Sequence, residues 1–306
     1  MSLVIVRRFC MTATLLFLSE ATPAQDIEPR RWTPLPVDLT VVGVGTIRGE
    51  GDIAFDPVLE IQDATVETTT TLISILRTFN LFGKTARMDV RLPHQHSRWK
   101  GLLAGEPRTA DRRGAGDPRV RLSVNFLGSP ALRGKAFRAY RASRPANTVA
   151  GAALAVTLPL GEYQKDKLLN LGQNRFTIRP QLGMVHTLGP WSAELTGSVF
   201  LYTDNHDFLV SHKREQDALF ALQAHAIYTP PGGWWVSLSA AYDWGGESTI
   251  DGAAKGDHRE DFLYGLATGF ALGPQSSLQL AYVANRTQTE LGADTDYLAL
   301  GCSIRF

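Results

Sequence analysis

Hydrophobic and polar residues alternate with a period of two along most of the chain, which is the pattern of a β-strand with one apolar and one polar face. Residues 191–203 show the pattern most clearly. There, Leu195 and Leu201 share one parity, whereas Ser192 and Glu194 share the other. The 3.6-residue period of an amphipathic helix is rare. The sequence therefore predicts a protein built mainly of strands with one apolar and one wet face.

The same alternation recurs in twelve segments, four of them clear and eight weaker. An even number of antiparallel strands is typical of single-chain outer-membrane barrels. We therefore expect an all-β fold, a transmembrane antiparallel β-barrel of about twelve strands that occupies residues 37–306. The predicted strands cover residues 37–48, 65–79, 83–97, 119–126, 147–158, 175–187, 191–203, 218–229, 233–244, 261–272, 277–287 and 297–306.

The connectors between these strands alternate between short turns and longer polar loops, as they do in outer-membrane barrels, where the short turns are periplasmic. Gly, Pro and Asn build the short turns. The predicted short turns are 80–83, 188–190, 230–233 and 273–275. The predicted long loops are 48–64, 98–117, 159–174, 204–217, 245–260 and 288–295.

One long connector, residues 127–146, falls where a short turn belongs. It holds Leu132, Ala136 and Tyr140 at a spacing of four, together with several Arg and Lys residues. Side chains four apart lie on one face of a helix. The segment is therefore predicted to be a periplasmic insert, either a short helix or a disordered basic loop.

The first residues have the pattern of a secretory signal. Arg7 and Arg8 precede an apolar stretch at 9–18, and small residues follow around Ala21 and Ala24. A stretch of about ten apolar residues is too short for a membrane helix. We expect residues 1–24 to be a cleaved signal peptide, residues 25–36 to form a periplasmic N-terminal segment, and the mature protein to reach the bacterial outer membrane.

Charge and cysteine content narrow the functional classes. The chain has 31 basic and 30 acidic residues without a basic block, so nucleic acid is not an expected partner. Cys10 leaves with the signal, and Cys302 alone cannot form an internal disulfide. No phosphate loop, nucleotide-binding glycine pattern or zinc spacing is present, and no cofactor is expected. The final strand ends on the aromatic Phe306, which predicts the barrel assembly machinery and outer-membrane lipids as partners.

Parity also places charged residues on the polar face that would line a lumen. Arginines dominate the third, fourth and sixth predicted strands, and acids occur on the seventh and ninth. Opposing walls of opposite sign would orient solutes and set ion preference. The alternative is a narrow barrel filled by salt bridges. The expected channel-lining residues are Arg87, Asp89, Arg91, Arg119, Arg121, Arg175, Arg179, Glu194, His225 and Asp243.

Two histidines need separate consideration. His94 and His96 share one face at the spacing of two metal ligands in a strand, but no third ligand accompanies them, and no metal is expected. Ser97 beside His96 suggests a phospholipase-like pair, yet adjacent residues of a strand point to opposite faces, and no catalytic residue is expected. Acidic loop residues that offer calcium ligands, or are simply solvated, are Asp204, Asp207 and Asp217.

Several stretches follow one another in the order of a known family. They are residues 116–119, 156–163, 170–175, 180–183, 202–205, 215–217 and 223–228. In these stretches the chain is similar to outer-membrane proteins labelled as the MetA pathway of phenol degradation, some of whose relatives are described as transporters. The resemblance implies uptake of hydrophobic or aromatic compounds. It departs at His206, where an acidic residue is expected, which argues against ion binding by that loop.

The leading prediction is an outer-membrane channel or transporter through which small solutes, hydrophobic or aromatic, pass by passive diffusion, and not an enzyme. Two alternatives stay open: a barrel enzyme acting on lipid, and a soluble secreted β-sandwich that binds a ligand. If the barrel is correct, parity makes Leu195, Val199, Leu280 and Leu300 face lipid.

Overall fold

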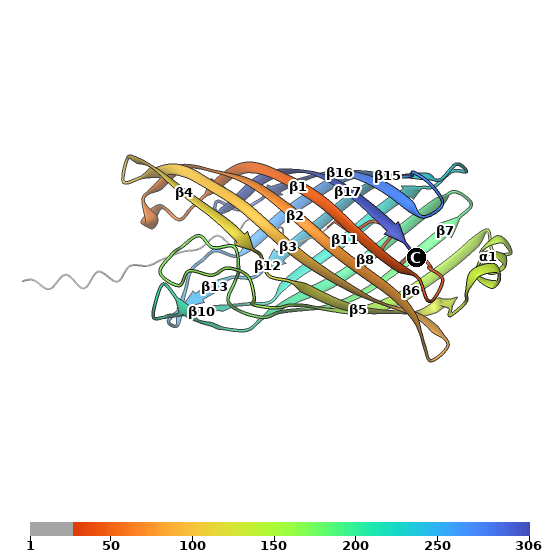
Figure 1. The fold of residues 1–306 in the computed structure, drawn as a ribbon. Helices are drawn as coiled ribbons and strands as arrows, with labels where there is room; N and C mark the ends of the chain where they lie inside the picture. The colour runs from red at the N-terminus through yellow and green to blue at the C-terminus, as the bar shows by residue number, and fades with distance from the viewer. Residues whose placement is uncertain (1–26) are drawn as a thin grey trace, which may run out of the picture.

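The computed structural model describes residues 27–306, so the predicted signal peptide lies outside the described residues. Twelve long antiparallel strands form one closed sheet, because β3 pairs with β2 on one side and with β5 on the other (Figure 1). The strands are β1 (Thr40–Ala54), β2 (Ile61–Leu81), β3 (Lys84–Leu103), β5 (Arg119–Pro130), β6 (Ala146–Thr157), β7 (Thr177–Leu188), β8 (Trp191–Tyr202), β11 (Leu219–Tyr228), β12 (Trp234–Gly245), β15 (Arg259–Ala271), β16 (Ser276–Thr287) and β17 (Gly292–Arg305).

The predicted barrel of twelve strands is confirmed, and the β-sandwich alternative is wrong, because the long strands close into one sheet instead of stacking as two. Strands β2 and β3 run further than predicted. The part of β3 beyond its predicted end carries the charged residues Arg98 and Lys100 on the outward face. The hydrophobic alternation therefore ends before the hydrogen-bonded ladder does.

Side-chain parity follows the pattern of the sequence. Along β8, Leu195 is exposed on the outer surface, whereas Glu194 and Thr196 are buried on the inner face. Along β16, Leu280 pairs with Leu300 of β17 and both are exposed on the outer surface, whereas Gln279 has the opposite parity and pairs with Gly301 on the inner face. The outer surface is therefore an apolar belt of the kind that faces lipid, and the polar residues turn inward.

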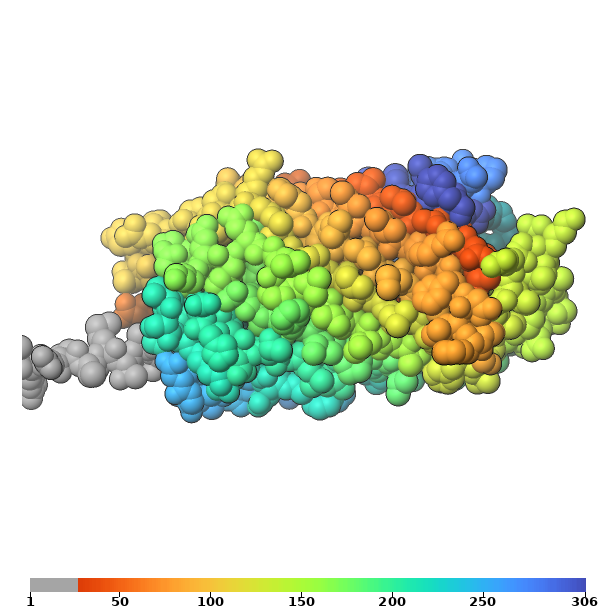
Figure 2. Space-filling view, turned by 60° about the horizontal axis from the view of Figure 1, so that its bottom comes forward, coloured from red at the N-terminus to blue at the C-terminus, as the bar shows by residue number. Residues whose placement is uncertain are grey.

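The two ends of the barrel differ. At one end, which we call the turn end, lie the short turns, Phe306 and the helix α1 (Gly134–Ala142) that occupies the 127–146 insert. The other, the loop end, carries long connectors and short elements. In Figure 2, residues around 160–220 gather at the loop end and the insert protrudes at the turn end. The short elements are η1 (Pro57–Leu59), β4 (Glu106–Ala115), β9 (Asn205–Phe208), β10 (His212–Gln216), β13 (Ser248–Ile250) and β14 (Ala253–Ala254).

Within residues 27–306, no helix has the length and apolar character required to cross a bilayer. The helix α1 has nine residues and none of them is buried.

Residues 27–39, which we call the lumen segment, precede β1 and follow the inner wall of the barrel before they reach the turn end. This differs from the expected periplasmic location of residues 25–36, because the described part of that stretch has its partners on the inner wall. The segment is fixed near the turn end by three hydrogen bonds: Thr78 Oγ1 donates to Pro36 O at 2.7 Å, Asp38 N donates to Thr78 O at 3.1 Å, and Val37 N donates to Leu132 O at 3.0 Å.

Candidate functional site: the barrel lumen

The central feature of the lumen is a carboxylate held by three arginines. Arg91 of β3 and Arg119 and Arg121 of β5, which we call the arginine triad, project inward from neighbouring strands. The carboxylate is that of Glu28 in the lumen segment. Its Oε1 lies 2.5 Å from Arg91 Nη2 and 3.1 Å from Arg119 Nη2, and its Oε2 pairs with Arg121 Nη1. Guanidinium groups bind carboxylates strongly because several N–H groups can donate at once.

A second ion-pair group lies beside the triad. Arg31 Nη1 of the lumen segment is 3.2 Å from Asp89 Oδ2, and Arg87 Nε is 3.3 Å from the same oxygen. Glu194 on β8 accepts hydrogen bonds from the backbone N–H groups of Arg31, at 2.8 Å, and Trp32, at 3.2 Å. The segment is therefore bound to both sides of the inner wall. Five guanidinium groups and three carboxylates lie in this region, so the guanidinium groups are in excess and the net charge is positive.

Trp32 anchors the lumen segment to β6, β7 and β8. The side chain is fully buried, and its indole Nε1 donates to Thr196 Oγ1 at 2.7 Å. Two glycines make room for the ring. A Cβ at Gly151 would lie 2.6 Å from the Trp32 ring, and one at Gly183 would overlap the indole nitrogen. The glycines thus form a socket that any larger side chain would fill.

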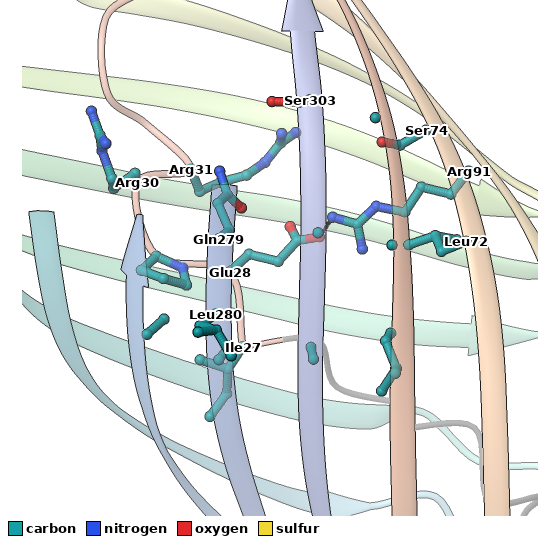
Figure 3. Close-up of a pocket in the computed structure, with 18 of the residues that line it drawn as sticks. Ile27, Glu28, Arg30, Arg31, Leu72, Ser74, Arg91, Gln279, Leu280 and Ser303 are labelled. Carbon is teal, nitrogen blue, oxygen red and sulfur yellow. Dashed lines mark ion pairs between the residues drawn. The ribbon is translucent and has the colours of Figure 1, made fainter. Parts of the chain in front are cut away.

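A cavity of about 600 Å³ remains between the lumen segment and the opposite wall (Figure 3). The triad side of the cavity presents Arg91 and Arg121, and Figure 3 shows the Glu28 carboxylate pointing toward Arg91. The remaining wall, from β1, β2 and β15 to β17, is mostly small or apolar. Its inward-facing members include Gly43, Gly45, Ile47, Leu72, Gly265, Ala267, Ala281, Val283, Ala299 and Gly301.

The structure places all ten predicted channel-lining residues inside the barrel or at its loop end, but they do not form two facing walls of opposite sign. Arg87, Asp89, Arg91, Arg119 and Arg121 form one group with Glu28 and Arg31. Glu194 does not face them across an open space, because it binds the backbone of the lumen segment. The simple picture of opposed walls is therefore corrected.

The other predicted residues lie apart from that group. Arg175 stacks over the ring of Tyr202, with its Cζ 4.5 Å from the ring centroid, and Arg179 stacks over the ring of Phe200, with its Cζ 4.3 Å from the centroid. His225 Nδ1 is 2.8 Å from Ser239 Oγ. Asp243, on β12, lies within electrostatic reach of Arg259 on β15.

Sequence reasoning missed Glu28, Arg31 and Trp32, because the segment that carries them has no strand periodicity and was assigned to the periplasm. One signal was available. Trp32 is a large aromatic residue in a stretch interpreted as a simple tether, and buried aromatic side chains usually mark packing sites.

The loop end of the lumen is narrowed by residues 158–176, which we call the mouth loop. Leu171 of this loop packs against Val66 and Trp99 on the inner faces of β2 and β3. Asp117 holds the loop by accepting hydrogen bonds from Gly161 N at 2.7 Å and Gln173 N at 2.8 Å. Burial raises the pKa of the Asp117 carboxyl, although these backbone donors oppose the rise.

Replacing Asp117 by alanine should loosen the mouth loop, because two backbone N–H groups lose their acceptor. We expect a loss of about 1–3 kcal/mol in the free energy of unfolding and faster cleavage of the loop by added protease. Asp166→Ala is the matched control, since Asp166 lies in the same loop with its side chain 58% exposed. Equal cleavage rates for the two variants would contradict the role assigned to Asp117.

His96 and Ser97 do not form the hydrogen-bonded pair of a phospholipase-like site. His96 faces outward, where Nε2 lies 3.0 Å from Asp111 Oδ1. Ser97 faces inward and its hydroxyl lies 2.9 Å from Thr68 Oγ1. The contact that a phospholipase-like mechanism needs is therefore not made. In the loops, Asp204 pairs with Lys213, and no group of three metal-ligating side chains is gathered within residues 27–306.

Comparisons with known proteins agree with this architecture. The profile of the family described as "Putative MetA-pathway of phenol degradation" matches residues 58–300. No curated protein sequence matches the chain at a significant level.

Two solved structures with a similar fold illustrate the likeness. The COG4313 outer membrane channel from Pseudomonas putida F1 superposes with a TM-score of 0.75 at 23% identity, over 92% of this chain and 100% of that chain. The transport unit of the autotransporter AIDA-I from Escherichia coli gives a TM-score of 0.50 at 10% identity, over 96% of this chain and 95% of that one. These likenesses establish the outer-membrane barrel fold.

Proposed function

We propose a function from the premise that this chain belongs to the family described as "Putative MetA-pathway of phenol degradation". The protein is a passive outer-membrane channel for small solutes and not an enzyme, and the channel prefers anions. The excess of guanidinium groups in the lumen carries this proposal. Rings or walls of arginine favour anions in a pore. The similar fold of a protein described as an outer membrane channel supports the same role.

The proposal includes location and solutes. The signal-like sequence at residues 1–24, the apolar outer belt and the terminal Phe306 support export, cleavage and insertion into the outer membrane by the barrel assembly machinery. The turn end, with α1, would then be periplasmic, and the loop end external. The family description supports hydrophobic or aromatic compounds as the solutes.

Ion selectivity tests the proposal. We expect the combined replacement of Arg119, Arg121 and Arg179 by serine to lower the chloride-to-potassium permeability ratio several-fold, because the lumen loses three positive charges. Reversal potentials across planar bilayers in a salt gradient measure this ratio.

The barrel should still assemble, since inner positions tolerate polar exchange, and a heat-modifiable band on a gel checks assembly. Arg98→Ser is the control, because Arg98 faces outward and pairs with Asp111 at 3.0 Å. An assembled triple variant with unchanged selectivity would show that these arginines serve only as structural partners. Wild-type protein that forms no conducting pore would overturn the channel function itself.

A further inference from the structure

Glu28 is a carboxylate supplied by the chain itself to a site on the barrel wall. We propose that the arginine triad is a binding site for solutes that carry one carboxylate and a compact apolar group, and that Glu28 occupies this site as an internal substitute until such a solute displaces it. This inference rests on the proposed channel function, because it assigns the substrate class of the same lumen.

The geometry of the triad is that of an anion site. Three guanidinium groups from two adjacent strands converge on one carboxylate, and both carboxylate oxygens are contacted. Arg121 is almost completely buried, with 3% of its side chain exposed. Planar guanidinium forks bind carboxylates with defined geometry, and a buried arginine needs an anionic partner. On the neighbouring wall, the carboxylate of Asp89 is already shared by Arg31, Arg87 and Arg121, so it does not balance the charge of the triad.

The occupant of the triad is not part of the wall. Glu28 belongs to the lumen segment, whose other attachments are Arg31, bound to Asp89 and Glu194, Trp32 in its glycine socket, and residues 36–39 at the turn end. Glu28 precedes these attachments in the chain, so it can leave the triad while Arg31 and Trp32 stay in place. A tethered group competes at an effective concentration in the millimolar range. A solute that offers only a carboxylate must reach that concentration, so contacts beyond the carboxylate decide which solutes compete.

The cavity supplies those contacts. Its volume of about 600 Å³ is within the usual range for small-molecule sites. Leu72, Val283 and Ile27 lie on the cavity wall together with the triad residues Arg91 and Arg121. A ligand with its carboxylate on the triad would place its remaining atoms against this apolar wall. Small wall residues such as Gly43 and Gly301 leave room for a compact group.

Calorimetric titration of the detergent-solubilised protein with benzoate tests the inference without requiring conductance. Glu28→Gln retains the shape of the side chain and removes its charge, so benzoate should bind this variant about tenfold more tightly than it binds the wild type. Adding Arg121→Gln to Glu28→Gln should remove the gain. Benzamide, which has the shape of benzoate without the charge, should show no gain, and acetate should bind more weakly than benzoate.

Two outcomes would overturn the inference: equal benzoate affinity in wild type and Glu28→Gln, or an equal gain for benzamide. Heat-modifiable migration verifies that each variant has folded, and Glu28→Ala provides a second variant without the charge. The test is separable from that of the proposed function. A protein that binds benzoate in this pattern but forms no pore would retain the anion site and lose the channel, whereas a conducting, anion-preferring protein without the pattern would lose only the site.

Discussion

Replacing Trp32 by alanine should raise the single-channel conductance several-fold and lower the free energy of unfolding by about 3–5 kcal/mol. The side chain is fully buried, fills the socket at Gly151 and Gly183, and donates a hydrogen bond to Thr196. Its loss leaves a large void and removes the side-chain anchor of the lumen segment on β6, β7 and β8, so the segment is held less firmly against the wall. Planar-bilayer recordings measure the conductance, and denaturant unfolding in bilayers measures the stability.

Trp191→Ala is the matched control for this prediction. Trp191 lies on β8, the strand that also carries Thr196, but it points outward and is 59% exposed. Its removal should leave the conductance unchanged. If Trp32→Ala conducts no more than the wild type although it inserts normally, the lumen segment does not limit passage through the barrel.

The second large effect concerns the outer face of the barrel. Leu280→Arg should destabilise the protein by about 2–4 kcal/mol, because Leu280 points outward from β16 and an arginine there must enter the hydrocarbon region. Unfolding titrations in lipid bilayers measure the difference. The same reasoning applies to the other outward residues predicted from parity, namely Leu195, Val199 and Leu300.

The neighbouring position provides the control. Gln279 has the opposite parity and faces the lumen, where an arginine remains hydrated, so Gln279→Arg should cost much less than Leu280→Arg. An equal loss of unfolding free energy in the two variants would mean that alternate residues of β16 do not face lipid and lumen as their parity indicates.

Most of the fold could be predicted because strand parity is a local property. Alternation along 191–203 was enough to identify both faces of β8, and the Gly and Pro residues near 188–190 marked the turn before it. Strand ends were less accurate. The polar ends of β2 and β3 carry on as hydrogen-bonded hairpins after the apolar alternation has stopped, because backbone hydrogen bonds do not require apolar side chains.

The candidate site could be predicted only in part. Parity placed the arginines of β3 and β5 on the inner face, which the structure shows. It could not identify their partners. Asp243 was expected to face the arginines across the lumen, whereas the carboxylate that actually meets the triad is Glu28.

The sequence by itself determined the class of fold, the number of long strands and the side of the wall on which each strand residue lies, since all three follow from a two-residue period and from turn residues close together in the chain. The tertiary structure alone decided what occupies the lumen. Glu28 and Arg121 are 93 residues apart, and Trp32 and Thr196 are 164 apart. Such partners meet only after the sheet has closed around a segment without periodicity, so no local pattern records the contact.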